Sequence, residues 1–178
     1  TIDALVNSEY DNKKILIVLA SEKRAGQEAQ DLANRLKNKY QDIFGEFLIT
    51  THPAGIAGEI MGKGPNITYA AEEARRKILN SRGIDYKNVL VSAFDIDTVV
   101  WPKYFSCLTW HFLTVEDAQK SSFQPVPLYN NNLWQTHAIS RVAALTSSFW
   151  QMIQQERPEK LVTFSSHAIP FKAHYEVG

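Results

Sequence analysis

The chain has 178 residues, of which 44% are hydrophobic and 21% are charged, a length and composition that suit one domain with a single core. Its 19 Lys and Arg residues balance 19 Asp and Glu residues, so we expect no nucleic-acid partner, which would require a basic face. The single cysteine, Cys107, excludes an internal disulfide, and we expect it to be a small buried side chain. No run approaches the roughly 20 apolar residues of a membrane-spanning helix, so we expect this chain itself to be soluble.

The first half of the chain alternates apolar runs with helical patterns. The apolar run Ile15 to Ala20 predicts a buried strand, and Gln27 to Tyr40 follows it as an amphipathic helix. Phe47 to Thr51 predicts a second strand. A glycine-rich loop, Pro53 to Pro65, then leads into a helix over Asn66 to Asn80, with Asn66 as its N-cap.

The second half continues this alternation. One segment, Phe123 to Tyr129, contains two prolines that confine it to an edge strand or an irregular segment. The other predicted elements are a strand over Val89 to Phe94, a helix over Pro102 to Leu113, a long helix over His137 to Glu156, a strand over Leu161 to Phe164 and a short helix over Phe171 to Val177.

These patterns predict the fold class. Strands separated by helix-length segments indicate an α/β protein with a mainly parallel sheet and helices on both faces. The long helix has one apolar face. Its neighbourhood is rich in aromatic residues, for which core packing is the simpler interpretation and a substrate-facing or membrane-facing patch is the alternative. The residues of that face are Ile139, Val142, Leu145, Thr146, Phe149 and Ile153, and the aromatic residues are Trp134, Phe149 and Trp150.

Two carboxylates follow the third apolar run directly. In parallel α/β sheets, ligands bind outside the carboxyl ends of the strands, and Asp95 and Asp97 lie at such an end. Carboxylates at this spacing can converge on one hard cation, Mg²⁺ or Mn²⁺. The alternative is that one caps the next helix and the other faces water.

The glycine-rich loop has a composition that can surround an anion. It contains Gly55, Gly58, Gly62 and Gly64, together with Lys63. The spacing does not match a phosphate-binding Walker A loop, because Lys63 is followed by glycine rather than by Ser or Thr. A loop that covers a ligand and a merely mobile loop therefore both stay open.

The segment KNVLVSAFDIDTVVWPKYFSCLTWHFL resembles the metal-binding segment of family 2 inverting glycosyltransferases of the GT-A type. In that family a hydrophobic strand ends in Asp-x-Asp and is followed by a helix that contains proline. ILIVLASE resembles the family's second strand, KGPN its Lys-x-x-Asn element, and FKAHYEVG the helix before its acceptor-site acidic motif. The resemblance implies a GT-A, Rossmann-like fold and covers nearly the whole chain.

The resemblance also implies an activity. A sugar would pass from a nucleoside-diphosphate donor, with UDP as the commonest nucleotide of the family, to an acceptor hydroxyl on a glycan or a lipid-linked molecule, with inversion. Glu22, Lys63 and Asp95 would bind the nucleotide sugar. Asp97, with Asp95 beside it, would hold Mn²⁺ or Mg²⁺, and a bound cation stabilises the charge of the leaving diphosphate.

Comparison with the family also indicates missing parts. The family's first strand has no counterpart before Ile15, and its general base would lie beyond Gly178. We therefore expect residues 1–178 to be a single, truncated catalytic domain with an incomplete sheet, whose exposed strand edge favours self-association. The resemblance further implies that the parent protein is associated with a membrane and carries this domain on the cytoplasmic face.

Two other functions stay open. FDIDTV also fits the nucleophile motif of haloacid dehalogenase-type phosphohydrolases, in which Asp95 would attack phosphorus and Asp97 would act as acid and base. Ser165 and Lys172 would then be the later phosphate-binding residues. The other alternative is a non-catalytic nucleotide-binding domain that keeps the fold without turnover.

Overall fold

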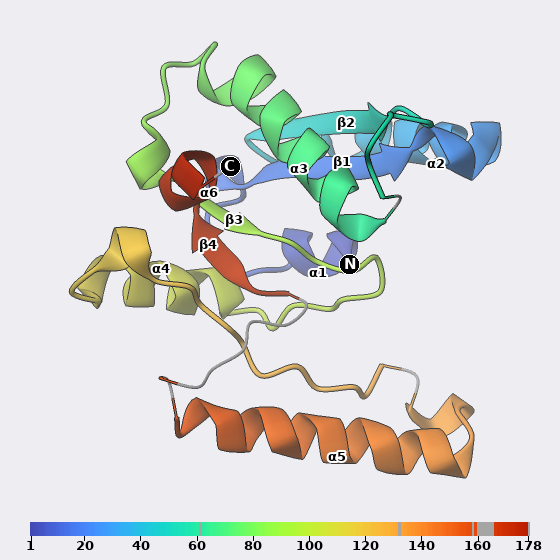
Figure 1. Cartoon of the computed structure of the whole chain (residues 1–178), viewed down its shortest axis with the longest axis vertical. Helices are drawn as coiled ribbons and strands as arrows, with labels where there is room; N and C mark the ends of the chain where they lie inside the picture. Colours follow the sequence, from blue (N-terminus) through green and yellow to red (C-terminus); the bar gives the residue numbers. More distant parts are fainter. Residues whose placement is uncertain (61, 132, 158, 160–165, 178) are drawn as a thin grey trace.

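The structure is a computed structural model of the chain, and it describes residues 1–60, 62–131, 133–157, 159 and 166–177 (Figure 1). The described residues form a mixed α/β protein, as the alternating patterns predict. Its helices are α1 (Ile2–Val6), α2 (Gly26–Tyr40), α3 (Lys63–Ala74), α4 (Tyr104–Thr114), α5 (Ala138–Gln155) and α6 (Phe171–Val177), and its strands are β1 (Leu16–Glu22), β2 (Glu46–His52), β3 (Leu90–Ser92) and β4 (Ala168–Pro170).

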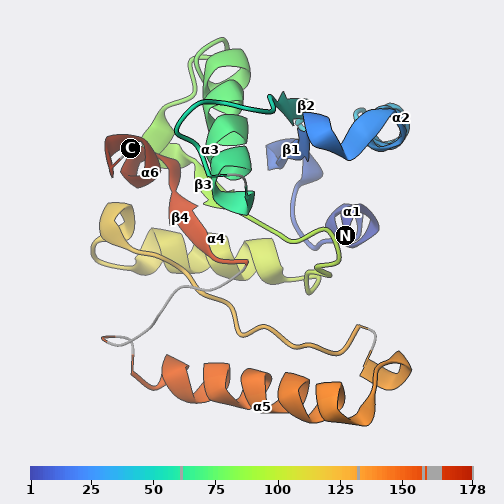
Figure 2. The same cartoon turned by 45° about the vertical axis from the view of Figure 1, so that its right-hand side comes forward.

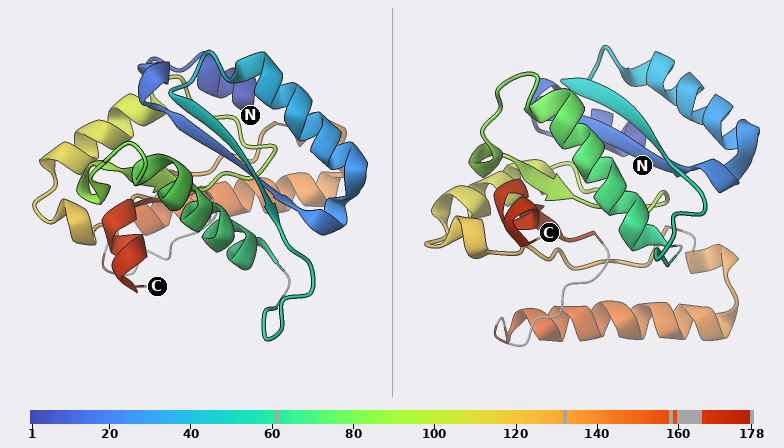
Figure 3. Two further views of the ribbon diagram at one scale, coloured as in Figure 1. Left: turned by 90° about the horizontal axis from the view of Figure 1, so that it is seen from above. Right: turned by 45° about the horizontal axis from the view of Figure 1, so that its top comes forward.

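The first two strands form a parallel pair, which confirms the predicted β-α-β start of the chain. The register runs from Leu16 opposite Glu46 to Glu22 opposite His52, so both strands end at the same edge. Helices α2 and α3 pack against this pair, and they lie on opposite sides of it (Figures 2 and 3). Covered on both faces, the pair can bury the apolar residues that fill its sequence.

The main core lies between this pair and the N-terminal part of the chain. Phe44 and Phe47 are nearly fully buried there, and Tyr40 from the end of α2 packs beside them. The Tyr40 hydroxyl donates a 2.6 Å hydrogen bond to Asp3 Oδ1, which lowers the pKa of that carboxyl. Helix α1 is thereby attached to the core by a polar contact as well as by the burial of Leu5.

The second sheet differs from the prediction of one mainly parallel sheet. Among the described residues, β3 pairs with β4 in the antiparallel direction, and Phe123 adds a single antiparallel bridge to Ala168. The rest of the segment after Phe123 is irregular, because its prolines have no N–H for a ladder. Strand β4 is only three residues long, so it gives no detectable period in the sequence. The predicted strand over 161–164 lies outside the described residues.

Helix α3 begins earlier than predicted and ends in an unusual turn. It starts at Lys63 after Gly62, so Asn66 lies within its first turns and is not the N-cap. At its other end the helix continues into a π-helical turn over Arg75–Leu79, in which the Asn80 N–H donates to the Arg75 carbonyl at 2.9 Å. This wider turn buries Ile78 and Leu79, two of the most enclosed apolar side chains.

The second half of the chain holds two helices near their predicted positions but with unexpected exposure. Cys107 on α4 is exposed, contrary to the expectation of a buried thiol. Helix α5 lies along one side of the molecule (Figures 1 and 2) and has no buried residue. Trp134, Phe149 and Trp150 are all exposed, so the interpretation of these aromatic residues as core residues is wrong. Within the described part of the chain, none of the helices is both long and apolar enough to cross a membrane.

Candidate functional site

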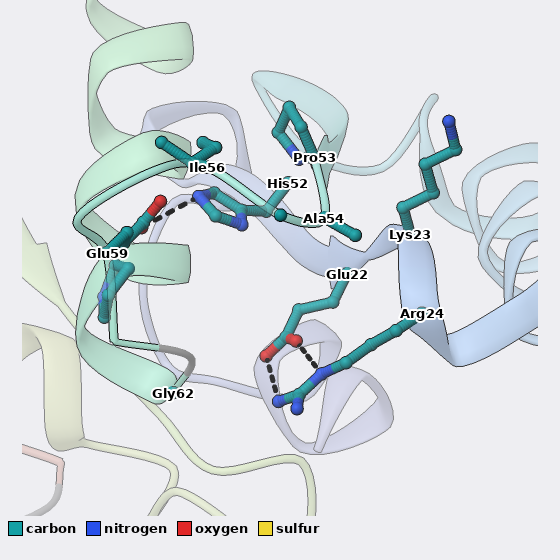
Figure 4. A pocket seen from close by; sticks show the side chains of 11 residues that line it. Glu22, Lys23, Arg24, His52, Pro53, Ala54, Ile56, Glu59 and Gly62 are labelled. Carbon is teal, nitrogen blue, oxygen red and sulfur yellow. Dashed lines mark hydrogen bonds and ion pairs between the residues drawn. The ribbon is translucent and has the colours of Figure 1, made fainter.

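The candidate site lies where β1 and β2 end. Glu22 and His52 are register partners at the last position of the two parallel strands, so both side chains start from the same edge. The loop after His52 and the N-terminus of α3 enclose a pocket next to them (Figure 4). This is the edge at which open α/β sheets bind ligands. The pocket is lined by Glu22, Lys23, Arg24, His52, Pro53, Ala54, Gly55, Ile56, Glu59, Gly62 and Pro65.

Glu22 forms an ion pair with Arg24, two residues further along the chain. Two nitrogens of the Arg24 guanidinium contact the two carboxylate oxygens of Glu22, with Nη2 to Oε1 at 3.1 Å, and this bidentate contact is visible in Figure 4. The carboxylate raises the pKa of Arg24 above its ordinary value. Both side chains are partly open to solvent, so the pair can exchange partners when an anion or a hydroxyl-bearing ligand enters.

His52 holds the glycine-rich loop against the strand end. Its Nε2 lies 3.1 Å from Glu59 Oε1, and its ring packs edge-on against the ring of Tyr69 on α3, with 5.0 Å between centroids. Both members of the His52–Glu59 pair are mostly covered by their surroundings. Through these two contacts His52 joins β2, the loop and α3 on one side of the pocket, and Figure 4 shows the contact with Glu59.

Another ion pair joins two segments that are far apart in sequence. Lys63, the first residue of α3, contacts the Asp95 carboxylate through its Nζ, and both side chains are about half exposed. Asp95 follows the third predicted strand, so this contact brings the end of the glycine-rich loop to the end of the β3 segment. Nearby, the Asn66 side chain donates to the Ala20 carbonyl at 3.3 Å, and its own Oδ1 is buried without a hydrogen-bond partner in the structure.

The two aspartates that the sequence singles out lie in one tight turn. The Thr98 N–H donates to the Asp95 carbonyl at 3.0 Å, which places Asp97 at the exposed tip. The Asn131 side chain donates to the Asp97 carbonyl at 2.8 Å, so the segment before α5 borders this turn. Burial, and after it the Asp95 charge, raise the pKa of Tyr129, which places this phenol near the Asp95 carboxylate.

The chemistry of this turn fits a hard divalent cation that a ligand completes. Carboxylate oxygens are the donors that Mg²⁺ and Mn²⁺ prefer, and Mg²⁺ commonly takes one or two protein carboxylates together with substrate phosphates and water. Among the described residues, no group of three or more His, Cys, Asp or Glu side chains could hold a metal ion by itself. A cation here would therefore rely on Asp97, with Asp95 beside it, and on oxygens from a bound ligand.

The structure places two of the four residues that the sequence predicts for the site in direct contact. Lys63 contacts Asp95, and Glu22 lines the pocket whose wall includes Gly62, next to Lys63. Asp97 shares the turn with Asp95 and faces solvent. Of the residues named for a phosphohydrolase, Ser165 lies outside the described residues, and Lys172 lies 3.7 Å from Glu176 on its own helix.

Sequence reasoning missed three side chains of the site. Arg24 and Glu59 become visible only through their contacts with Glu22 and His52, and Tyr129 only through the effect of the Asp95 charge on its pKa. Arg24 lies two residues after a strand end, which is a signal that could have found it. Glu59 lies inside a loop and Tyr129 lies 34 positions after Asp95, so neither has a local pattern.

Comparisons with known proteins add no relative. No protein-family model matches the chain, and neither a curated protein nor a solved structure matches it.

Proposed function

We propose that the chain binds a nucleoside-diphosphate sugar at the common edge of β1 and β2 and takes part in inverting transfer of the sugar to an acceptor hydroxyl. The GT-A-type, Rossmann-like fold belongs to this proposal. Residues 1–178 then act as part or all of a catalytic domain, with Glu22, Lys63 and Asp95 as donor-binding residues and Asp97 as the cation ligand.

One observation carries the proposal. The Lys63–Asp95 ion pair joins the start of α3 to the turn after β3, and Gly62, the residue before Lys63, lines the same pocket as Glu22. Two residues chosen from separate segments of sequence, Lys63 and Asp95, are thus in contact, and Glu22 lies at the edge where parallel α/β sheets bind ligands. Residues that only cap helices or face water have no reason to converge in this way.

The charges of the site suit a diphosphate. Lys63 is half exposed and can turn from Asp95 to a phosphate oxygen, while Arg24 offers a planar guanidinium that suits phosphate as well as carboxylate. Asp95 would then be released toward ligand hydroxyls. A divalent cation at Asp97 would stabilise the negative charge that develops on the leaving diphosphate.

Calorimetric titration with UDP tests the proposal. We expect saturable binding in the presence of Mn²⁺, loss of binding in EDTA, and loss of the Mn²⁺ dependence in Asp97→Ala. Asp31→Ala serves as the matched control, because Asp31 is an exposed aspartate on α2 outside the site. The control should bind as the unmodified chain does.

Two results would overturn the proposal. The first is the absence of UDP binding in Mn²⁺, or binding that Asp97→Ala leaves unchanged. The second is Asp95-dependent hydrolysis of p-nitrophenyl phosphate, which would indicate a phosphohydrolase with Asp95 as its nucleophile.

A further inference from the structure

Helix α5 presents an apolar face to solvent. Ile139 is 77% exposed, Phe149 is 63% exposed, and the large apolar side chains between and beyond them are also exposed. They recur at helical spacing and so share one side of the helix. The exposed members are Ile139, Val142, Leu145, Phe149, Trp150, Met152 and Ile153.

The opposite side of α5 faces the rest of the protein, and it is polar. The half-covered residues at helical spacing on that side are Arg141, Ala144, Ser148, Gln151 and Gln154, all polar except Ala144. Ser148 Oγ donates to the Pro127 carbonyl at 3.1 Å, which ties this side to the segment that runs between α5 and the other elements (Figure 2). The Gln151 Oε1 atom is buried without a hydrogen-bond partner in the structure.

The orientation of α5, with its apolar side in water and its polar side against the protein, is the reverse of the usual one. A surface helix of a globular protein turns its apolar stripe to the core and its polar side to solvent. Helix α5 instead turns the half-covered Ser148 and Gln151 toward the protein and exposes Leu145 and Phe149 to solvent. An apolar patch of this kind marks a surface that meets something other than water.

The shape of the face favours a lipid surface over a second copy of the chain. An 18-residue helix is roughly 27 Å long and about 10 Å wide. Its outer half therefore covers on the order of 400 Å², below the roughly 800 Å² per partner of a stable interface. The apolar face is also wider than a coiled-coil seam, since Leu145, Trp150 and Met152 flank the central stripe.

The composition of the helix agrees with this choice. Arg141 is the single charged residue between Ala138 and Gln155, and the polar positions are Ser, Thr and Gln. Trp134 just before the helix is 81% exposed, and Trp150 lies near its other end with 59% exposure. Tryptophan is enriched where an apolar phase meets water, because its ring is apolar and its N–H is polar.

We propose that α5 is an interfacial helix that lies in the plane of a lipid bilayer, with its apolar face in the acyl boundary and its polar side against the protein. The helix lacks a basic polar face, so binding depends on apolar insertion and not on anionic lipid. The proposal is independent of the proposed glycosyl transfer and is tested by a separate measurement.

Vesicle flotation with the full 178-residue chain tests the proposal. The probes are vesicles of phosphatidylcholine alone and of phosphatidylcholine mixed with phosphatidylglycerol. We expect the chain to float with both, with a blue shift of tryptophan fluorescence. The triple variant Val142→Asn, Leu145→Asn, Phe149→Asn should lower the partition coefficient by about tenfold or more, because each lost side chain removes apolar transfer energy.

A matched triple variant controls for a general loss of surface apolarity. Leu32→Asn, Ile60→Asn and Val177→Asn replace exposed apolar residues outside α5, and this variant should bind vesicles as the unmodified chain does. Circular dichroism checks that both variants remain folded. The proposal fails if the unmodified chain does not bind either vesicle, if binding requires phosphatidylglycerol, or if the α5 variant binds equally well. It also fails if light scattering shows a dimer that the α5 substitutions convert to a monomer.

Discussion

Gly45 should tolerate no side chain, although its backbone conformation is not the left-handed one that favours glycine. It lies just before β2, where its N–H is within hydrogen-bonding distance of the Asn12 and Ile15 carbonyls, at 3.1 and 3.0 Å. A Cβ built at this position would lie 2.2 Å from the Lys13 carbonyl oxygen and 3.0 Å from the Lys13 carbonyl carbon. Both obstructing atoms belong to the backbone, so no side-chain rotation relieves the contact.

The magnitude follows from that distance. Carbon and oxygen need more than about 3 Å, so Gly45→Ala must push two hydrogen-bonded backbone segments apart by about 1 Å. We expect a loss of about 3 kcal/mol in the free energy of unfolding, as for an overpacked core. With a denaturant slope of about 2 kcal/mol per molar urea, the midpoint falls by about 1.5 M.

Urea unfolding followed by circular dichroism measures this midpoint. The control is Gly64→Ala, because Gly64 lies in the first turn of α3 and a Cβ there meets no atom within 4 Å. Alanine is the better helix former, but Gly64 precedes Pro65, whose ring disfavours helical backbone in a preceding residue with a Cβ, so this variant should change the free energy of unfolding by less than about 1 kcal/mol. If Gly45→Ala unfolds within about 0.5 kcal/mol of the unmodified chain while Gly64→Ala behaves as expected, the close approach of Gly45 to Lys13 does not exist.

Two further predictions concern burial. Phe47 is 1% exposed, so Phe47→Ala should lower the free energy of unfolding by about 3 to 5 kcal/mol. Phe149 is 63% exposed, so Phe149→Ala should change that free energy by less than about 0.5 kcal/mol. Urea unfolding measures both values. Burial raises the pKa of Tyr104 and, together with the Asp95 charge, that of Tyr129, so both phenols should ionise above pH 10 in an absorbance titration. These raised values stabilise the folded chain below about pH 10, the unfolded pKa, and the contribution is lost as the pH rises through the folded values. Asp95→Asn should lower the pKa of Tyr129 and leave that of Tyr104 unchanged; equal shifts in both would contradict the proximity of Asp95 to Tyr129.

The local structure was predictable where the pattern was long. The run after Ile15 and the run at Phe47 gave both strands of the parallel pair to within two residues at each end, since apolar continuity between turn signals is a strong signal. The antiparallel pairing of β3 with β4 was not predictable, because a three-residue strand carries no period and its partner lies more than 70 residues away. The segment between them includes Pro125 and Pro127, which the sequence correctly kept out of a regular ladder.

The site was predictable in its residues but not in its contacts. Asp95 and Lys63 can be chosen because one follows an apolar run and the other sits among glycines. Their ion pair spans 32 positions and depends on how α3 packs against β1 and β2, which no local pattern encodes. The apolar stripe of α5 shows the same limit, because periodicity defines a stripe and leaves open the direction in which it points.

The π-helical turn at the end of α3 lets the two ends of one helix face different surroundings. Each residue of an α-helix advances about 100° around the axis, so the extra residue of a wide turn offsets everything beyond it. Residues from Lys63 onward can thus be aligned with the pocket while Ile78 and Leu79 are aligned with the interior. Removing one residue from this turn would restore a regular helix, in which the two ends could no longer both keep their present orientations. The residues before this turn, which border the pocket, and the buried residues at its end can therefore change sequence independently.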